Sequence, residues 1–442
     1  MHASSRRYWQ AVSRRWWTIC LLATLPLSGP VMAADNLPIK VGVLHAVTGT
    51  MATNERPVRD IILMAIDELN RAGGVIGRQI EAVVEDPASD SEQLVAKAAK
   101  LLQHDKVAAV FGCWISSSRK AVRPVFESHN GLLFYPLQYE GEECSKNIIY
   151  MGATLNQQAL PAVDYLMRSE GGLRRRFYLI GTDDVYSRTT NQVIHRYLTK
   201  AKRLPDTYMA ETYTPSHHRD YGRIAKTIKR FCLDGDAAVI NTLNGDSNDA
   251  FFKALAAQGV TADMCPVMSL SLAELELQQM DVEPMVGHMA AWNYFMSLPY
   301  PRNFLWLNAY KTRCQLHDIP GAQCVTSDLM MHAYIQVKLW AKAVERAQST
   351  DIASVQRALA GMSINSPGGK YRVDEYNHHT WKPVYIGKIR PDGQFDVIWK
   401  TKDWIRPRPW SEVLHQRRGC DWSEHGKGTY DVVSGNRVWV AE

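Results

Sequence analysis

Ile39-Lys40-Val41-Gly42-Val43-Leu44 is the stretch that decides the fold. It is short, apolar and rich in β-branched residues, which is typical of a strand buried inside a parallel sheet. Residues 58–70 follow with apolar side chains at helical spacing, and Gly73-Gly74 ends that predicted helix. A buried strand followed by an amphipathic helix is the repeating unit of an α/β sheet, so this stretch predicts an α/β fold.

The same alternation continues to about residue 135 and restarts near residue 177. The further predicted strands are 79–85, 107–112, 132–135, 177–181, 209–213, 237–241 and 266–268. The further predicted helices are 87–102, 116–128, 189–200, 221–231 and 249–258. This pattern predicts two doubly wound, mostly parallel sheets, each forming one lobe, with 151–158 crossing between them.

Polar loops follow the carboxyl ends of these strands, where open α/β sheets bind their ligands. They are rich in hydroxyl, amide, aromatic and Asp side chains, and comprise residues 46–50, 113–116, 135–139, 181–184 and 241–246. None of them is a GxGxxG or P-loop motif, so no nucleotide or other cofactor is expected.

Residues 1–34 have the composition of a secretory signal peptide. The segment has four Arg and no acid before the apolar run at 16–27, which is too short to span a bilayer, and small residues follow it. We expect cleavage after Ala33 or Ala34. Export would follow the ordinary secretion route, with twin-arginine export as the alternative. The alternative structural interpretation is a buried N-terminal helix of the mature protein.

The charge balance argues against nucleic acid or an anionic membrane surface as a partner. Removal of the leader with its four Arg lowers the formal net charge from +6 to +2, and acids and bases are interspersed. The remaining chain is long enough for two or more lobes.

Seven of the eight cysteines remain after the predicted cleavage. They form no CxxC motif and no Cys/His cluster with zinc spacing, so no metal site is expected. In an oxidising compartment Cys314 and Cys324 could close a short structural loop. The odd number leaves at least one free thiol, as is common for buried cysteine.

Sequence stretches spread over nearly the whole mature chain carry a family resemblance. They include Asp86–Asp90, Val110–Trp114, Gly131–Pro136, Gln138–Glu142, Asn156–Gln158, Gly181–Asp183, Asn244–Asp246, Ala291–Phe295, Asn377–His379 and Asp392–Phe395. On these residues the chain resembles the ABC-transporter substrate-binding proteins for urea and short-chain amides, within the branched-chain-amino-acid-type periplasmic binding proteins.

The resemblance implies a type I periplasmic binding protein fold whose hinge the chain crosses three times. Lobe one would comprise 35–152 and 286–355, lobe two 153–285 and 356–400, and a C-terminal extension at 401–442 would pack on the lobes. The implied function is capture of urea or a short-chain amide in the periplasm by Venus-flytrap closure, for nitrogen uptake through a membrane ABC permease. The protein would be a monomer or weak dimer and would not be an enzyme.

The resemblance also implies which residues form the pocket. From lobe one these are Trp114, Ser116, Tyr135, Gln138 and Tyr139, and from lobe two Asp183, Asp184 and Asp246. The chemistry agrees with a small planar amide. A helix start at Ser116 offers a hydroxyl and backbone N–H groups to a carbonyl oxygen, and the Asp carboxylates accept hydrogen bonds from NH₂ groups. The aromatic rings can enclose the plane of the ligand.

Asp184 departs from the family pattern, which commonly has Tyr there and Pro at the position of Ser187. An additional carboxylate beside a neutral amide costs desolvation unless it is paired or points away, whereas it suits a cation. The alternative ligand class is therefore guanidinium, an amidine, or an amide that carries an amine.

Six of the pocket residues also have a structural interpretation. Trp114 could be a core aromatic, and Tyr135-Pro136 could be a rigid turn. Ser116, Asp183 and Asp246 could simply cap helices, and Asp184 could be an exposed loop acid. Two other functions also remain as alternatives. A periplasmic amide sensor would share the leader, and an amidase could use Cys113, although no His or Lys is placed by sequence to activate it.

Overall fold

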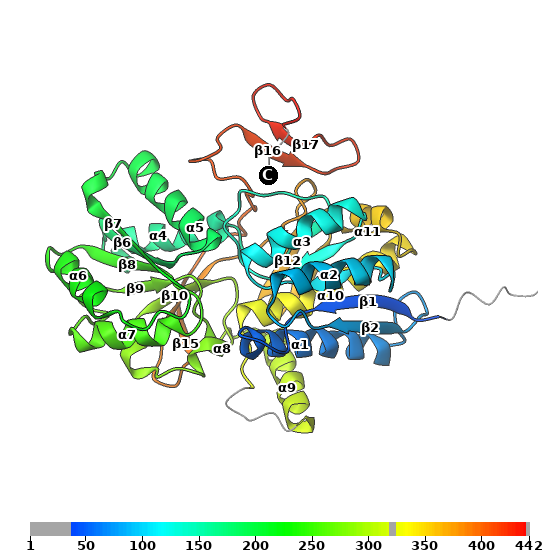
Figure 1. The fold of residues 1–442 in the computed structure, drawn as a ribbon, viewed down its shortest axis with the longest axis horizontal. Helices are drawn as coiled ribbons and strands as arrows, with labels where there is room; N and C mark the ends of the chain where they lie inside the picture. Colours follow the sequence, from blue (N-terminus) through cyan, green and yellow to red (C-terminus); the bar gives the residue numbers. More distant parts are fainter. Residues whose placement is uncertain (1–36, 318–323, 439–442) are drawn as a thin grey trace, which may run out of the picture. The chain divides into compact units, whose positions relative to one another are not determined.

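The computed structural model describes residues 37–317 and 324–438, so the predicted leader and its cleavage point lie outside the described residues. The described part contains two large sheets with helices around them (Figure 1). Most elements of the first sheet are drawn in blue and cyan in Figure 1, and most elements of the second sheet in green.

The first sheet consists of five parallel strands in the order β2-β1-β3-β4-β5. The strands are β1 (Ile39–Leu44), β2 (Ile80–Glu85), β3 (Val110–Gly112), β4 (Leu133–Tyr135) and β5 (Ile148–Tyr150). The helices of this lobe are α1 (Ala52–Arg71), α2 (Ser91–Gln103), α3 (Ser116–Ser128), α9 (Pro301–Leu316), α10 (Asp328–Ala347) and α11 (Ile352–Leu359). Val41, Val43 and Leu44 of β1 are fully buried, as expected for a central strand with helices on both faces.

The second sheet consists of seven strands in the order β15-β14-β10-β9-β8-β6-β7. Five are parallel, namely β6 (Arg176–Thr182), β7 (Met209–Thr214), β8 (Ala237–Thr242), β9 (Val267–Ser269) and β10 (Met289–Trp292). Two antiparallel strands, β14 (Tyr385–Ile389) and β15 (Phe395–Lys400), extend one edge. The helices of this lobe are α4 (Ala159–Met167), α5 (Val185–Arg196), α6 (Gly222–Leu233), α7 (Ser247–Ala257) and α8 (Glu274–Leu277).

Two smaller sheets complete the described fold. A three-stranded sheet is formed by β11 (Ser363–Ser366), β12 (Gly369–Val373) and β13 (Thr380–Trp381), and a C-terminal hairpin by β16 (Arg418–Asp421) and β17 (Gly428–Asp431). Short helical turns are η1 (Leu155–Gln157), η2 (Ser169–Gly171), η3 (Tyr197–Ala201), η4 (Asp206–Tyr208) and η5 (Glu283–Met285).

The predicted α/β fold with two doubly wound lobes is confirmed. Helix α1 begins at Ala52 and not at residue 58. The apolar pattern missed its first residues because a polar residue there, Glu55, faces inward and interrupts the pattern. The carboxylate of Glu55 is buried there, where it accepts a hydrogen bond from the backbone N–H of Ala46 at 3.0 Å and contacts Nδ1 of His45 at 2.9 Å.

Two lobe boundaries differ from the prediction. Strand β10 pairs with β9 in the second sheet, so the chain leaves lobe two after Trp292 and not at 285/286. The return to lobe two comes just before β14, not at 355/356, since α11 packs on α10 and Tyr150 of β5 pairs with His379. Both boundaries were expectations from the family resemblance, which implies the order of the lobes but not the residue at which this chain passes from one sheet to the other.

The cysteines form three disulfides among the described residues: Cys144–Cys420, Cys232–Cys265 and Cys314–Cys324. The structure thus contains the pair expected from sequence, at a separation of 10 residues. The other two pairs, at separations of 276 and 33 residues, have no local sequence signature. Cys113 is the free, buried thiol.

Candidate functional site

A cavity lies between the carboxyl ends of the strands of the two sheets. Its free volume is about 100 Å³. The lining residues come from the loops after strands of both lobes: Met51, Asn54, Trp114, Ile115, Ser116, Ser117, Tyr135, Leu137, Gln138, Asp184, Val185, Tyr186, Ser216, His217, Asn244, Gly245, Asp246, Ser271, Glu276, Trp292 and Leu329. The lobes meet across it, because Nε2 of Gln138 donates to the carbonyl of Leu270 at 3.4 Å. The location agrees with the general rule for ligand sites in open α/β sheets.

Aromatic side chains form part of the cavity wall. Trp114 follows β3, Tyr135 ends β4, and Trp292 ends β10 in the other lobe. Hydrogen bonds fix two of the rings, since Tyr135 donates to the carbonyl of Trp114 at 2.7 Å and the indole of Trp292 donates to the carbonyl of Leu272 at 2.8 Å. Rings held in this way can enclose a planar ligand without having to reorganise.

The amino end of α3 points its first turn at the cavity through Ile115, Ser116 and Ser117. Ile115 precedes the helix and supplies no side-chain cap, so the N–H groups of the first turn are available to a ligand oxygen. The hydroxyl of Ser116 is directed elsewhere, because it donates to the carboxylate of Glu140 and accepts from Arg119 at 3.3 Å. The backbone of this turn therefore fits the expected role better than the Ser116 hydroxyl does.

Behind this turn lies a fully buried ionic group in lobe one. The guanidinium of Arg119 donates to Glu140 at 3.1 Å and to Glu143 at 2.9 Å. It also lies over the rings of Tyr135 and Tyr139 at 5.0 and 4.5 Å. Arg119 and the neighbouring Lys120 and Arg123 hold the pKa of Glu143 at about 2 despite its burial. The charges on this side of the cavity are thus compensated within the protein.

Asp184 lines the cavity and also caps α5. One carboxylate oxygen accepts from the backbone N–H of Ser187 at 2.8 Å, and the other accepts from the side-chain amide of Asn244 at 2.7 Å. Burial raises the pKa of Asp184 above its usual range. Because each carboxylate oxygen has a further lone pair, Asp184 can still accept a hydrogen bond from a ligand.

Asp246 stands at the rim of the cavity, at the start of α7. Its carboxylate contacts Nδ1 of His217 at 2.9 Å and the guanidinium of Arg219 at 2.5 Å. Its side chain is 41% exposed. The negative charge of Asp246 is therefore offset by solvent and by the guanidinium of Arg219.

Two residues expected in the pocket do not line the cavity. Tyr139 points into lobe one, where its ring stacks with Tyr150 at 5.0 Å and with His379 at 5.8 Å. Asp183 points outward and pairs with Arg188 at 2.5 Å. Each directly adjoins a residue that does face the cavity, and consecutive side chains in extended segments point to opposite sides. The expectations for Tyr139 and Asp183 are corrected on this ground.

The cavity also contains side chains that sequence reasoning missed. Glu276 adds a carboxyl group to the cavity lining, and burial raises its pKa to about 7. One of its carboxylate oxygens accepts from the backbone N–H of Ala273 at 3.1 Å. Like the loops that were identified, the loop after β9 follows the carboxyl end of a parallel strand. That position was the sequence signal that could have pointed to this part of the cavity. Tyr186 belongs to the same wall and donates to the carbonyl of Leu270 at 3.3 Å.

The cavity is richer in acceptors than in cations. Asp184, Asp246 and Glu276 carry carboxyl groups, and none of the described residues that line the cavity is Lys or Arg. Within 37–317 and 324–438, no three His, Cys, Asp or Glu side chains are grouped so as to hold a metal ion. No helix in that part of the chain is both long and apolar enough to cross a bilayer.

Comparison with known proteins identifies the family of this chain. A model described as a periplasmic binding protein domain matches residues 39–416. The chain is also 28% identical over 370 residues to the leucine-, isoleucine-, valine-, threonine- and alanine-binding protein of Pseudomonas aeruginosa, which covers 78% of this chain and 87% of that protein.

Solved structures share the fold. A solute-binding protein of an ABC transporter from Rhodopseudomonas palustris, in complex with 3,4-dihydroxybenzoic acid, has a TM-score of 0.71 at 19% identity and covers 84% of this chain and 99% of that chain. A branched-chain amino acid transporter substrate-binding protein from Streptococcus pneumoniae, in complex with isoleucine, has a TM-score of 0.68 at 18% identity, with 84% and 100% covered. At these identities the likeness concerns the fold alone.

Proposed function

The chain belongs to the periplasmic binding protein family of ABC-transporter solute-binding proteins, and we propose that its ligand is urea or a short-chain amide held between the two lobes. Closure of the lobes would bury the ligand, and the closed protein would deliver it to a permease in the membrane. The observation that carries the ligand class is the small cavity with aromatic walls, acceptor side chains and the uncapped first turn of α3.

The hydrogen-bonding groups of the cavity complement a planar amide. The backbone N–H groups of Ser116 and Ser117 would donate to the carbonyl oxygen of the ligand. Asp184 and Glu276, on the opposite lobe, would accept from its NH₂ groups. The free volume of about 100 Å³ supports a ligand of a few heavy atoms, since pockets for drug-sized ligands are typically several times larger.

A cationic ligand such as guanidinium or an amidine is the second candidate. It is favoured by two carboxyl groups, the half-buried Asp184 and the buried Glu276, whose hydrogen bonds from the protein come from neutral donors. A positively charged ligand would offset the desolvation that raises both pKa values. The two candidates share one geometry and differ in whether Asp184 and Glu276 are both ionised when the ligand is bound.

A thermal-shift panel on the mature protein tests the ligand class. The panel comprises urea, formamide, acetamide, guanidinium, isoleucine and 3,4-dihydroxybenzoate, each at millimolar concentration. A ligand present at 100 times its dissociation constant stabilises the folded protein by about 2.7 kcal/mol. A shift with urea or an amide supports the proposal, and a shift with guanidinium alone supports the cationic alternative. Stabilisation by isoleucine or the benzoate alone would contradict both.

A further inference from the structure

The C-terminal segment at residues 405–422 begins at the hinge. The backbone N–H of Ile405 donates to the carbonyl of Lys382 at 2.9 Å, just before the chain enters β14. The carbonyl of Ile405 accepts from the side-chain amide of Gln157 at 2.8 Å, just after the first crossing between the lobes. This segment, called the strap below, is therefore attached at its start to two of the three hinge crossings.

From the hinge the strap makes non-covalent contacts with lobe two. Asn156 of η1 donates to the carbonyl of Arg406 at 2.8 Å and accepts from the backbone N–H of Arg408 at 2.9 Å. Val413 and Leu414 pack against the apolar cluster formed around α4. A cavity of about 340 Å³ remains between the strap and α4, so these contacts do not fill the space between them.

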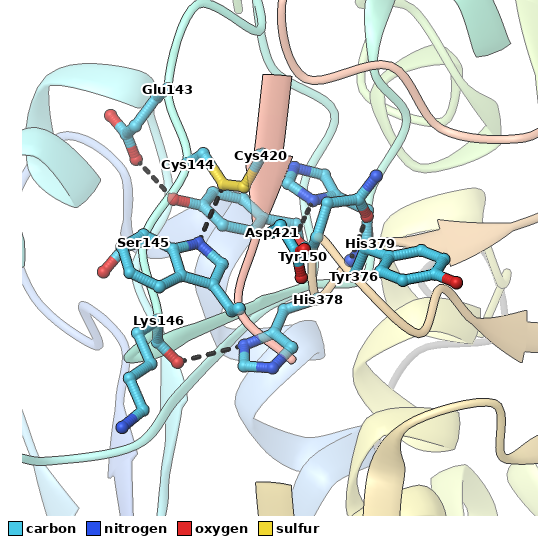
Figure 2. Close-up of a disulfide and its surroundings, with 12 residues drawn as sticks. Glu143, Cys144, Ser145, Lys146, Tyr150, Tyr376, His378, His379, Cys420 and Asp421 are labelled. Atoms are coloured by element: carbon cyan, nitrogen blue, oxygen red, sulfur yellow. Dashed lines mark hydrogen bonds between the residues drawn. A yellow bond between two sulfur atoms is a disulfide. The ribbon is translucent and has the colours of Figure 1, made fainter. Parts of the chain in front are cut away.

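The strap is attached far more firmly to lobe one. Pro409 accepts from the backbone N–H of Glu142 at 2.6 Å, and the carboxylate of Glu142 accepts from the backbone N–H of Ser411 at 2.9 Å. The disulfide between Cys144 and Cys420 then fixes the strap covalently (Figure 2).

Trp422 reinforces the disulfide at the end of the strap. Its backbone N–H donates to the carbonyl of Tyr376 at 2.6 Å, and its indole donates to the sulfur of Cys144 at 2.9 Å. Figure 2 shows Cys420 and Asp421 beside the Glu143–Lys146 segment, with His378 and His379 on the neighbouring segment of lobe one. The far end of the strap thus has a covalent bond and hydrogen bonds to one lobe.

We propose that the strap limits how far the two lobes open. Its lobe-one contacts at Glu142 and Cys144 lie before the first hinge crossing, and its lobe-two contact at Asn156 lies after it. Rotation of the lobes about the hinge therefore separates points that the strap joins, and opening must first break the contacts of Asn156, Val413 and Leu414. Because the disulfide holds the strap on lobe one, opening breaks the non-covalent contacts of the strap with lobe two.

An inter-lobe distance measurement tests the strap without any ligand, so its outcome is independent of the ligand class proposed above. Nitroxide labels would be attached through keto amino acids at two exposed sites, Val84 of lobe one and Leu173 of lobe two. Pulsed electron paramagnetic resonance then gives the distance distribution between the lobes. In the double variant Cys144→Ser/Cys420→Ser we expect the distribution to shift by several ångströms towards the open form.

The control is a disulfide that does not join the strap to a lobe. Cys314→Ser/Cys324→Ser removes the bond between the end of α9 and the residues before α10, both within lobe one, and should leave the distribution unchanged. An equal shift in both double variants, or no shift in the Cys144→Ser/Cys420→Ser protein, would overturn the proposal.

A second strap variant keeps the disulfide. Val413→Ala/Leu414→Ala weakens only the contact with lobe two and should widen the same distance distribution. This variant keeps the test decisive if the protein without the Cys144–Cys420 bond does not fold. An unchanged distribution in the alanine variant would contradict a strap that holds lobe two by these contacts.

Discussion

The two sides of the ligand cavity differ in whether their buried carboxyl groups are paired with a cation. Behind the lobe-one wall, Glu140 and Glu143 are buried together with Arg119, which hydrogen-bonds to both. On the lobe-two wall, Asp184 and Glu276 accept hydrogen bonds from neutral amide groups, and burial raises both pKa values. The first wall is electrostatically complete without a ligand, whereas the second has acceptor capacity left for one.

This difference assigns separate tasks to the lobes. A compensated ionic group is costly to disturb, so it suits a rigid support for Trp114, Tyr135 and the first turn of α3. Buried carboxyl groups without a cation are unfavourable in the empty protein, and a donor-rich ligand relieves that cost. We therefore expect variants of the lobe-one group to change stability, and variants of the lobe-two carboxyl groups to change ligand preference and pH dependence.

The largest effect is expected for Arg119→Met. The substitution leaves Glu140 and Glu143 buried with only the half-exposed Lys120 and the neighbouring Arg123 to offset them. Removal of one partner from a buried ionic group typically costs about 3–5 kcal/mol. Calorimetry should show a correspondingly large fall in the melting temperature.

A matched control for this variant is Arg188→Met, which breaks the half-exposed pair with Asp183. Such pairs contribute about 1 kcal/mol or less. If Arg119→Met and Arg188→Met lowered the melting temperature equally, the lobe-one group would not be the rigid support inferred here.

Glu276→Gln should have the next largest effect, with a clear pH dependence. Burial raises the pKa of Glu276 to about 7 in the folded protein, so the folded state favours the protonated form. The cost of the buried carboxylate is fully present above pH 7 and disappears as the pH falls towards 4.5. Gln removes the charge, and should stabilise the ligand-free protein at pH 8 by up to about 3 kcal/mol.

The same variant should gain little stability at pH 4.5, where Glu276 is already protonated in the folded protein. Thermal unfolding of both proteins at the two pH values measures the difference, and the shared contributions of other buried groups cancel in the comparison. An equal gain at both pH values would mean that packing, not charge, accounts for the stabilisation.

Much of the fold was predictable because buried strands and amphipathic helices have local patterns. Helix α3, for example, has the predicted bounds Ser116–Ser128. The rule that ligands bind at carboxyl ends of strands identified the loops. Within those loops the family resemblance selected eight residues, of which six line the cavity: Trp114, Ser116, Tyr135, Gln138, Asp184 and Asp246.

The remaining errors concern the direction in which a side chain points and contacts between segments that are distant in sequence. Gln138 lines the cavity and Tyr139 packs into lobe one, yet the sequence cannot distinguish two adjacent polar-tipped residues of one loop. The sheet membership of β10 and the pairing of Cys144 with Cys420 depend on contacts between distant segments. Glu276 is the third residue of α8, which follows the loop after β9. The sequence predicts the position of that loop but not that the Glu276 side chain faces the cavity.

A smaller effect is expected for Asp184→Asn, which distinguishes the two ligand classes. Asn is as good a helix cap as Asp, so the start of α5 should be retained while the charge is removed. If the ligand is a cation, its affinity should fall about tenfold or more, equivalent to about 1.4 kcal/mol. If the ligand is a neutral amide, the affinity should change by less than about threefold.

Isothermal titration with urea, acetamide and guanidinium measures this difference, and Asp183→Asn is the matched control. Asp183 is adjacent in sequence but points outward to Arg188, so its substitution should leave every affinity unchanged. An equal loss of affinity in Asp183→Asn and Asp184→Asn would contradict the assignment of Asp184 to the cavity.

The smallest effect is expected for Asp246→Asn, although Asp246 lines the same cavity. Its carboxylate is 41% exposed, contacts His217 and pairs with Arg219, so solvent and the guanidinium of Arg219 already offset the charge that the substitution removes. The affinity should change by less than about twofold, and the stability by less than about 1 kcal/mol. The same titrations measure the change. A loss as large as that of Asp184→Asn would place Asp246 with the uncompensated carboxyl groups, and the charge contrast would then extend to the rim of lobe two.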